Sequence, residues 1–287
     1  MLDLSIIIVN YNGARYLEDC LSSIYRSTHK ISFEIIFVDN RSTDNSVELV
    51  KTKFPNVKII ASDKNLGFCG GNNKGLKVYA GRYAMLLNTD TITKKGAFDS
   101  MVEFMDSHPK AGACGPKLLN TNGTIQHQGG MLGKKFWLYK YPTKISYMIG
   151  ACIMARREVI DQVGGLDENF FFSNDDLDWC KRITKAGWDI YFIPQAEVIH
   201  HGGYTINKFN QMLFIEGFRG GLYFCKKHYG NIAYQIYRIL LIFAILVATI
   251  FSAILYPFLK NKEKLPAFFK ILMLSLKGEI ISPHERG

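Results

Sequence analysis

The sequence predicts an α/β fold, in which a parallel-rich sheet is flanked by helices. Three observations support this prediction. Short β-branched runs alternate with helical stretches along the first 90 residues. These runs are almost entirely apolar, as expected for strands that are buried on both faces of a helix-covered sheet. Polar residues recur directly after the runs, where an open α/β sheet forms its ligand crevice.

The first 90 residues contain two β-α-β units. In the first unit, the strands Ser5–Val9 and Phe33–Val38 enclose the helix Ala14–Tyr25. The strand, helix and strand of the second unit are Val57–Ala61, Gly71–Gly81 and Tyr83–Leu87. This order is typical of a nucleotide-binding half-domain, which places its ligand at the carboxyl ends of its strands.

The middle of the chain is less regular. Its expected elements are mixed-sheet strands near Ala113–Lys117 and Ile153–Arg156, a helix over Leu177–Ala186, a strand over Asp189–Ile193 that ends at Pro194, and an aromatic helix over Asn207–His228. A proline has no N–H to donate to a sheet, so it favours the end of a strand.

The C-terminal part contains a segment long enough to cross a membrane. No charged residue occurs from Ile239 to Leu259, and a helix of roughly 20 apolar residues can span a bilayer. The alternative is a long helix buried against the main domain. Basic residues on both sides leave open whether the segment crosses the membrane or dips and returns. The following stretch, Leu265–Lys277, is amphipathic enough to lie at the membrane surface.

Composition excludes a disordered chain and indicates an anionic partner. The 287 residues are 48% hydrophobic and carry a net charge of +10, so the chain can bury enough apolar surface to fold. Residues 217–287 hold 10 Lys and Arg against 3 Asp and Glu. This placement indicates an anionic membrane surface and no nucleic acid. Six scattered cysteines and an N-terminus without a signal-peptide pattern predict a cytoplasmic location.

Polar residues follow the first two predicted strands. Asn10 and Tyr11 come directly after the first strand, and Asp39 comes after the second. A carboxylate at this place can accept hydrogen bonds from a ribose or a base, on which Tyr11 could stack. The alternatives are a tight Asn-Gly turn and, in the second loop, a helix N-cap, for which Asp44 is well placed.

A glycine-rich stretch, Asn65–Gly75, follows the third strand. Glycines let backbone N–H groups approach a ligand closely, and the N-terminus of a following helix favours an anion. The spacing fits neither the dinucleotide fingerprint nor the Walker loop, which argues against an ordinary dehydrogenase or P-loop enzyme.

Asp90 follows the fourth strand, and His200 follows a later one. A carboxylate at a strand end can bind Mg²⁺ or Mn²⁺, because these ions prefer oxygen ligands and take few of them from protein. The alternative is a loop aspartate that satisfies local backbone groups. Either His200 or His201 is a candidate metal ligand or proton donor.

Three neighbouring carboxylates, Asp175, Asp176 and Asp178, begin a predicted helix. They repel one another, so they serve as caps, bind cations, or include one carboxyl with a raised pKa. The helix dipole accounts for part of the cluster. The apolar run Phe170–Phe172 beside it indicates a partly desolvated cleft, which suits a general base.

Together these segments resemble the inverting family 2 glycosyltransferases with a GT-A fold, in particular the rhamnosyltransferase-like branch that builds bacterial surface polysaccharides. The resemblance covers residues 4–230 and rests on six motifs in the family's order: Ser5–Gly13, Val38–Asp44, Asn65–Asn73, Leu87–Asp90, Gly164–Phe171 and Asp175–Asp178. It implies a GT-A catalytic domain over residues 1–230 and a membrane-associated helical segment over residues 231–287, at the cytoplasmic face of the membrane.

The resemblance also implies roles for the candidate residues. The nucleotide sugar would be bound by Asn10, Tyr11, Asp39, Asn65, Gly67, Gly71 and Asn88. Asp90 and His200 would hold a divalent cation, Mg²⁺ or Mn²⁺. Asp176, with Asp175 beside it, would be the base that deprotonates the acceptor hydroxyl. The chain departs from the family at Asn88, where the metal motif has its first aspartate, and at Asp175, where the acidic pair has glutamate.

The implied reaction transfers a sugar, with rhamnose as a candidate, from a nucleoside-diphosphate sugar to a hydroxyl of a glycan or polyprenyl-linked acceptor. It proceeds with inversion and without a covalent enzyme intermediate. A sugar nucleotidyltransferase and a non-catalytic membrane-bound nucleotide-sugar or polysaccharide-binding protein are the alternatives. The first would carry a glycine-rich loop with Arg and Lys, which Val9–Gly13 lacks. Asp90, Asp176 and His200 speak against the second.

Overall fold

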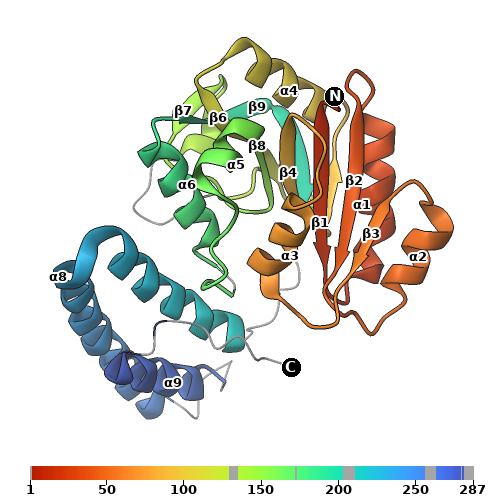
Figure 1. Ribbon diagram of the computed structural model, residues 1–287. Coiled ribbons are helices and arrows are strands. Elements are labelled where there is room, and N and C mark those ends of the chain that lie inside the picture. Colours follow the sequence, from red (N-terminus) through yellow and green to blue (C-terminus); the bar gives the residue numbers. More distant parts are fainter. Residues whose placement is uncertain are drawn as a thin grey trace. The chain divides into compact units, whose positions relative to one another are not determined.

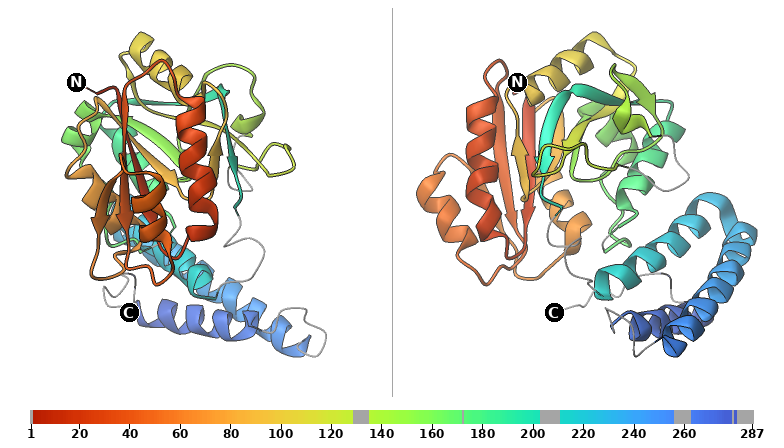
Figure 2. Two further views of the ribbon diagram at one scale, coloured as in Figure 1. Left: turned by 90° about the vertical axis from the view of Figure 1, so that its right-hand side faces the viewer. Right: turned by 180° about the vertical axis from the view of Figure 1, so that it is seen from behind.

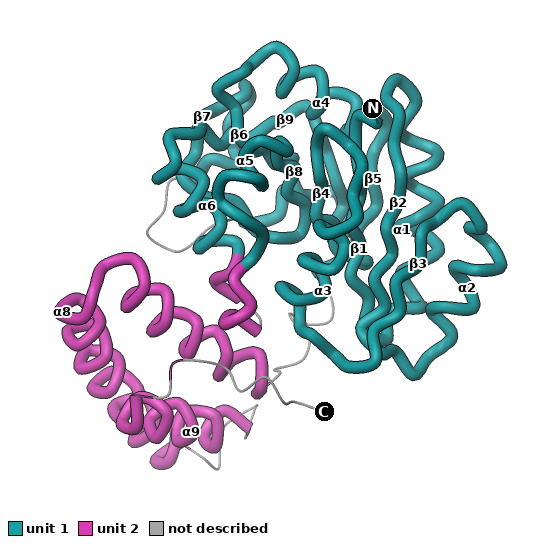
Figure 3. Tube along the Cα trace, viewed as in Figure 1, with its two compact units in different colours: residues 1–166, 176–202, 287 teal, residues 167–175, 203–286 magenta. Residues whose placement is uncertain are grey.

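The chain divides into two compact units (Figure 3). Unit 1 consists of residues 1–166 and 176–202, and unit 2 of residues 167–175 and 203–286. The computed structural model describes residues 2–128, 135–171, 173–202, 211–255, 263–278 and 280. The expected domain boundary after residue 230 stays a prediction.

Unit 1 is built on one mixed sheet, to which nine strands of the described chain belong (Figure 1). The strands are β1 (Leu4–Asn10), β2 (Phe33–Asp39), β3 (Lys58–Ala61), β4 (Tyr83–Asn88), β5 (Thr91–Thr93), β6 (Ala111–Leu119), β7 (Thr143–Ile145), β8 (Cys152–Arg156) and β9 (Asp189–His200). They are ordered β3-β2-β1-β4-β8-β6-β9-β5, and β7 pairs with β9. The strands from β3 to β4 run parallel, whereas β8 is antiparallel to both of its neighbours. The α/β prediction is confirmed.

Helices connect the parallel strands, as the two β-α-β units require. Those of the sheet unit are α1 (Ala14–Ser27), α2 (Ser46–Lys53), α3 (Gly67–Leu76), α4 (Ala97–Ser107), α5 (Arg157–Val163), α6 (Asp175–Lys185) and the 3-10 turn η1 (Phe136–Leu138). The sequence did not indicate α4, α5, β5 or β7. The helix expected over Gly71–Gly81 begins four residues earlier than predicted.

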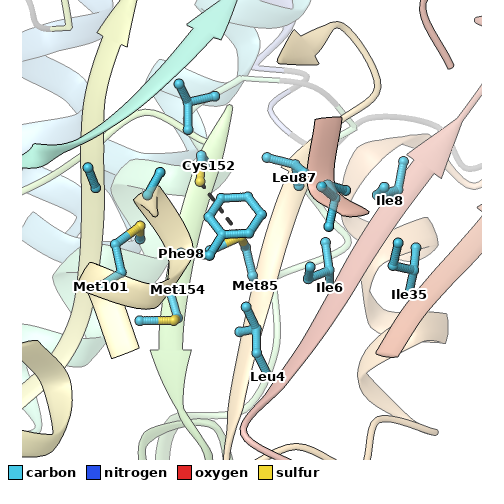
Figure 4. Close-up of a cluster of buried hydrophobic side chains, with 14 of the residues drawn as sticks. Leu4, Ile6, Ile8, Ile35, Met85, Leu87, Phe98, Met101, Cys152 and Met154 are labelled. Carbon is cyan, nitrogen blue, oxygen red and sulfur yellow. Dashed lines mark hydrogen bonds between the residues drawn. The ribbon is translucent and has the colours of Figure 1, made fainter. Parts of the chain in front are cut away.

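The main core lies on one face of β1 (Figure 4). Leu4, Ile6 and Ile8 of β1 are fully buried there, together with Phe98 and Met101 of α4. Helix α1 contributes to the same core, whereas α3 covers the opposite face of β1 (Figure 1 and Figure 2). The alternation of side chains along a strand therefore divides the apolar run of β1 between two layers of helices.

Two glycines let α3 approach β1 closely. A Cβ added at Gly71 would lie 2.5 Å from Val9 Cγ1, and one added at Gly75 would lie 2.4 Å from Ile7 Cγ2. Both distances are too short for a real side chain. These glycines, one helical turn apart, therefore serve the packing of α3 on the sheet.

Strand β9 continues beyond the point where it was expected to end. It passes through Pro194, so the predicted end at this residue is wrong. Its pairing with β6 shifts there: Pro116 pairs with Ile193, but Lys117 pairs with Glu197. The missing N–H of a proline is harmless in such a bulge, because the bulged residues do not donate to the ladder.

Unit 2 contains the helices α8 (Gln211–Ile254) and α9 (Lys264–Lys277). Gly230 interrupts α8 with φ 81° and ψ −178°, a conformation that glycine adopts at little cost. A buried apolar cluster of the unit is formed by both helices and Ile280, and it consists of Leu222, Tyr234, Leu241, Ile245, Ile271, Leu274 and Ile280. The predicted helix over Asn207–His228 is confirmed from Gln211 onward, and residues 207–210 lie outside the described part.

Arg238 of α8 binds the C-terminal end of α9. Its Nε donates to the carbonyl oxygen of Ser275 and its Nη2 to that of Leu276, each at 2.6 Å. The last carbonyl groups of a helix lack partners within the helix. A cation at this end also complements the helix dipole, so Arg238 joins α8 and α9 electrostatically as well.

Candidate active site

Three candidate residues lie at the same edge of the sheet in unit 1. Strand β1 pairs with β2 on one side and with β4 on the other, so Asn10 aligns with Asp39 and Val9 with Asn88. The carboxyl ends of parallel strands meet at one edge. Asn10, Asp39 and Asn88 are therefore brought together, as their positions in the sequence predicted.

Asn10 and Asp39 are buried and hydrogen-bonded at this edge. The Nδ2 group of Asn10 lies 3.4 Å from Asp39 Oδ1 and 3.0 Å from Ser42 Oγ. Asp39 Oδ2 accepts a hydrogen bond from the backbone N–H of Ser42 at 3.0 Å. Asp39 thus organises its own loop. Tyr11, which is 55% exposed, leaves its ring accessible to a ligand.

Asp44 connects the beginnings of two helices. Its Oδ2 accepts from the backbone N–H of Ala14 at 3.0 Å, and its Oδ1 accepts from that of Ser46 at 3.1 Å. Burial alone would raise the pKa of Asp44, but the hydrogen bonds from Ser46 and Ala14 hold this pKa below its ordinary value. Asp44 therefore accepts hydrogen bonds from the first N–H group of both helices, although the N-cap position of α2 is Asn45 and not Asp44 as expected.

The glycine-rich stretch begins α3 with a turn. Asn65 Oδ1 accepts from the backbone N–H of Gly67 at 2.9 Å, and Gly67 has a φ of 69°, which favours glycine. The carbonyl oxygen of Gly67 accepts from Asn40 Nδ2 at 2.8 Å. This turn explains the early start of the helix. Nucleotide-sugar binding by Asn65, Gly67 and Gly71 stays a prediction.

Asn88, Asp90 and His200 converge although 112 residues separate the first from the last. His200 Nε2 lies 3.4 Å from Asp90 Oδ1 and 3.5 Å from Asn88 Nδ2. The pairing of Thr91 with His200 in the β5–β9 ladder produces this proximity. The side chains of Asp90 and His200 are 16% and 13% exposed, so both are largely buried and yet reachable from solvent.

His201 has a different environment. Its backbone N–H donates to the carbonyl oxygen of Asp90 at 2.9 Å, and its ring packs against Tyr16 at 5.0 Å between centroids. Of the two histidines, His200 is therefore the one whose ring faces the Asp90 carboxylate.

Gln126 orients His200, a role that the sequence did not indicate. Gln126 Nε2 donates to the His200 carbonyl oxygen at 3.1 Å, and Gln126 Oε1 lies 2.8 Å from His200 Nδ1. Because Nε2 of an amide can only donate, Oε1 accepts the Nδ1–H of the imidazole. Gln126 lies in an irregular stretch 74 residues from His200, so no sequence pattern could reveal the contact.

Asp90 and His200 form a donor set that suits a divalent cation. In a neutral imidazole that donates its Nδ1–H to Gln126, the Nε2 lone pair of His200 faces the Asp90 carboxylate. Two electron-pair donors facing each other favour a positive charge between them. Among the described residues, no group of three or more His, Cys, Asp or Glu could hold a metal ion. The phosphates of a substrate would therefore have to complete the coordination of Mg²⁺ or Mn²⁺.

Asp176 lies in the first turn of α6 and is partly buried. Its Oδ2 accepts from the backbone N–H of Gly150 at 3.0 Å, and its Oδ1 from that of Leu177 at 2.8 Å. Burial raises the pKa of Asp176 above its ordinary value, and the two hydrogen bonds oppose this only in part. Phe172, in the predicted apolar run, lies outside the described residues.

The segment Gly150–Ala151 connects Asp176 to the end of β4. Gly150 donates to Asp176, and the next residue, Ala151, accepts from the backbone N–H of Asn88 at 3.0 Å. Adjacent residues of one segment therefore hold Asp176 and Asn88. The structure attaches the predicted base to the same strand end as the predicted metal ligands.

The other two carboxylates of the cluster have different surroundings. Asp178 is fully buried and pairs with Arg182, whose Nε lies 2.8 Å from Asp178 Oδ2. Arg182 also donates to the carbonyl oxygens of Val163 and Gly165, each at 2.6 Å. Asp178 thus has a structural role. Asp175 is 4% exposed and belongs by its contacts to unit 2.

A family model described as "Glycosyl transferase family 2" matches residues 5–164, more than half of the chain. The chain belongs to this family. The matched segment includes the loops after β1, β2 and β4, and the glycosyltransferase carries Asp176 and His200 beyond it. Its membership makes the protein an enzyme, so neither the binding-protein nor the nucleotidyltransferase alternative is supported.

Two relatives illustrate the range of the similarity. The glycosyltransferase is 26% identical over 240 residues to an N-acetylglucosaminyl-diphospho-decaprenol L-rhamnosyltransferase of Mycobacterium tuberculosis, a match that covers 71% of this chain and 78% of that protein. It is 28% identical over 218 residues to the O-antigen biosynthesis protein RfbC of Myxococcus xanthus, which covers 69% of this chain but only 17% of that protein.

Solved structures share the fold. The mannosyltransferase PcManGT from Pyrobaculum calidifontis, in complex with GDP-Man and Mn²⁺, has a TM-score of 0.60 at 15% identity, over 96% of this chain and 77% of that one. GalNAc-T7 with UDP, GalNAc and Mn²⁺ has a TM-score of 0.62 at 18% identity, over 77% of this chain and 47% of that one. The glycosyltransferase therefore has the predicted GT-A fold.

Proposed function

We propose that this glycosyltransferase moves a sugar, with rhamnose as the first candidate, from a nucleoside-diphosphate sugar to a hydroxyl of a glycan or lipid-linked acceptor. The reaction would serve the synthesis of a bacterial surface polysaccharide. The observation that carries the proposal is the attachment of Asp176 to the strand end that also holds Asn88, Asp90 and His200. The names of the rhamnosyltransferase and the O-antigen biosynthesis relatives support the choice of substrates.

In this proposal Asp176 is the general base. The acceptor hydroxyl gives its proton to the Asp176 carboxylate while its oxygen forms a bond to the anomeric carbon of the donor. The bond between that carbon and the diphosphate oxygen breaks in the same displacement, and the nucleoside diphosphate leaves with the electron pair. One displacement inverts the configuration of the carbon. The raised pKa of Asp176 favours its acceptance of the proton.

The remaining residues would bind the donor. Asp39 and Asn10 would contact the nucleoside beside the exposed ring of Tyr11, and Asp90 and His200 would hold the cation. A bound Mg²⁺ or Mn²⁺ supplies positive charge that offsets the charge on the departing diphosphate. Asn65, Gly67, Gly71 and Asn88 complete the proposed donor pocket.

We further propose that unit 2 binds the cytoplasmic face of the membrane. Within the described part of the chain, α8 is the one helix long and apolar enough to cross a membrane, with a mean hydropathy of 2.3 over its most apolar 18 residues. Its large side chains are exposed, including Phe243 at 68% and Ile254 at 67%. Apolar surface of this kind is rarely left in water, and the exposed Lys264 suits anionic lipids.

The Asp176→Asn variant tests the proposed base. We expect transfer to fall by at least about a hundredfold, whereas the thermal shift caused by the donor stays unchanged. Asp161→Asn, on the exposed face of α5, is the matched control and keeps full activity. Unimpaired turnover of Asp176→Asn would remove Asp176 as the base. A thermal-shift screen of nucleotide sugars that includes dTDP-rhamnose identifies the donor.

A further inference from the structure

A pocket of about 400 Å³ lies within unit 2, between the part of α8 before Gly230 and α9. Its described walls come from these two helices alone. The volume lies in the range of ordinary ligand sites, which is roughly 300–1,000 Å³. None of the residues proposed for catalysis lines this pocket. The side chains that line it are therefore what indicates its ligand.

The α9 wall combines two cations with apolar side chains. Lys270, Met273, Leu274 and Lys277 all line the pocket, and their spacing of three, four and seven residues places them on one face of the helix. Along the axis the two lysines are roughly 10 Å apart, at about 1.5 Å per residue. Lys270 and Lys277 therefore lie at the two ends of an apolar strip on this face of α9.

The α8 wall adds a third cation and a hydrogen-bond donor. Arg219 Nε lies 3.4 Å from Glu216 Oε1, and the two side chains are 11% and 2% exposed. Glu216 is the one carboxylate in the described walls, against three cationic side chains. The Gln211 Nε2 group is buried and has no hydrogen-bond partner among the described residues. The walls are thus positively charged and rich in donors, which suits an anion.

The pocket is also open to apolar surface. Met212 of α8 and Phe269 of α9 line it while remaining 41% and 56% exposed. Phe269, Met273 and Leu276 follow one another along the same side of α9, and the last two are 39% and 51% exposed. An anion held in this pocket therefore has an apolar strip beside it, along which a hydrocarbon chain can lie.

We infer that this pocket binds the phosphate or diphosphate headgroup of a polyprenyl lipid, the carrier of the acceptor sugar. The three cations meet the phosphate oxygens, and the apolar strip of α9 meets the first isoprene units. A free phosphate or a soluble anion would use the cations but leave the apolar walls unexplained. The inference rests on the proposed function, in which the acceptor is linked to a lipid.

Vesicle binding of the full-length protein tests the inference. Neutral phosphatidylcholine vesicles are compared with the same vesicles containing decaprenyl phosphate. For Lys270→Gln/Lys277→Gln we expect the gain in binding from decaprenyl phosphate to fall roughly tenfold or more. Each lysine near a charged headgroup strengthens binding, and this variant removes two of them. Lys51→Gln/Lys110→Gln, which removes two exposed charges from unit 1, keeps the whole gain. Lys270 and Lys277 are both exposed, so the variant retains its core.

Two further arms distinguish the source of the anion. Vesicles that carry phosphatidylglycerol at equal charge should bind both variants almost alike. If the α9 variant loses binding to these vesicles as strongly as to decaprenyl phosphate, the pocket is an unspecific basic surface and the inference fails. Ile215→Trp, which fills the pocket without changing its charge, should lower binding to decaprenyl phosphate alone, and unchanged binding would also contradict the inference.

Binding and transfer fail independently in this design, because vesicle binding is measured without a donor. A wild-type protein that prefers decaprenyl phosphate but transfers no sugar contradicts the proposed function and supports the pocket. A wild-type protein that transfers sugar to a lipid-linked acceptor without any preference for decaprenyl phosphate contradicts the pocket alone.

Discussion

Gln126 and His200 exchange two hydrogen bonds, so that the imidazole has one orientation and one tautomer. The amide donates to the His200 carbonyl oxygen at 3.1 Å, and its oxygen lies 2.8 Å from Nδ1. Residues that hydrogen-bond to a metal ligand commonly tune the affinity of the site for the metal ion. The proposed metal site therefore depends on a residue that does not touch the metal.

Replacing Gln126 with leucine should weaken Mn²⁺ binding by roughly 10- to 100-fold, because the His200 ring loses its orientation. A calorimetric titration with Mn²⁺ and a nucleoside diphosphate measures this loss. Gln128→Leu is the matched control, since Gln128 is also buried and, among the described residues, bonds to the backbone of Leu118 and Pro116, each at 3.1 Å. Equal weakening in both variants would mean that Gln126 acts only through the fold.

The rate of transfer should fall on acidification, and it should begin to fall at a higher pH than the pKa of an ordinary aspartate would cause. Asp176 accepts a proton only when it is ionised, so kcat/KM decreases as the pH falls through its pKa. Burial raises this pKa above the usual value of about 3.9, which shifts the acidic limb upward by the same amount. A pH profile that stays flat down to pH 4 would contradict the assignment of Asp176.

Acid unfolding should not obscure this limb. Arg82 holds the pKa of Asp106 below its ordinary value, and Lys94 and Lys117 do the same for Glu197. A depressed pKa contributes stability that is complete above the ordinary value and is lost only as the pH falls toward the depressed one. The contribution of these pairs to stability is therefore undiminished above about pH 5, and circular dichroism at each pH verifies that the protein stays folded.

Gly71→Ala should destabilise the protein by about 1–3 kcal/mol. The new Cβ would lie 2.5 Å from Val9 Cγ1, and a β-branched side chain in a buried strand cannot move away cheaply. Gly217→Ala is the control, because nothing lies within 4 Å of its added Cβ and alanine favours the helix. Urea unfolding compares the two, and equal stabilities would show that α3 can shift away from β1.

Arg182→Met should destabilise the protein by about 3–5 kcal/mol, since it leaves the fully buried Asp178 without its paired charge. Removing both charges, in Asp178→Leu/Arg182→Met, should recover part of this loss. The exposed pair of Lys53 and Glu18, at 2.7 Å, provides the comparison, and Lys53→Met should cost at most about 1 kcal/mol. A double variant as unstable as the single one would show that Arg182 acts through its backbone contacts alone.

Most of the site residues that the sequence predicted correctly to lie together are found at strand ends. Asn10, Asp39, Asn88 and Asp90 each follow an apolar run, and parallel pairing alone is enough to bring such residues to one edge. The pattern of the runs likewise predicted the α/β fold and the long apolar helix. These predictions needed only local sequence and one rule of sheet topology.

Other parts of the site depend on contacts that no local pattern contains. Gln126 reaches His200 across 74 residues, and Gly150 reaches Asp176 across 26. Sequence reasoning also misjudged Pro194, because whether a proline ends a strand or lies in a bulge is decided by the neighbouring strand. The packing role of Gly71 was missed for the same reason, since it depends on Val9 beneath it.

The bulge in β9 has a consequence for how this protein can vary in length. Before the bulge, Tyr191 and Ile193 face the main core, whereas after it Ala196 and Val198 do so. Odd-numbered residues thus face the core before the bulge, and even-numbered residues face it afterwards. The bulge therefore determines on which face of the sheet His200 lies. A deletion that slips the ladder after the bulge by one residue would turn His200 to the other face, whereas a slip of two residues would keep it on the same face. Among natural variants, insertions and deletions at this bend should come in even numbers.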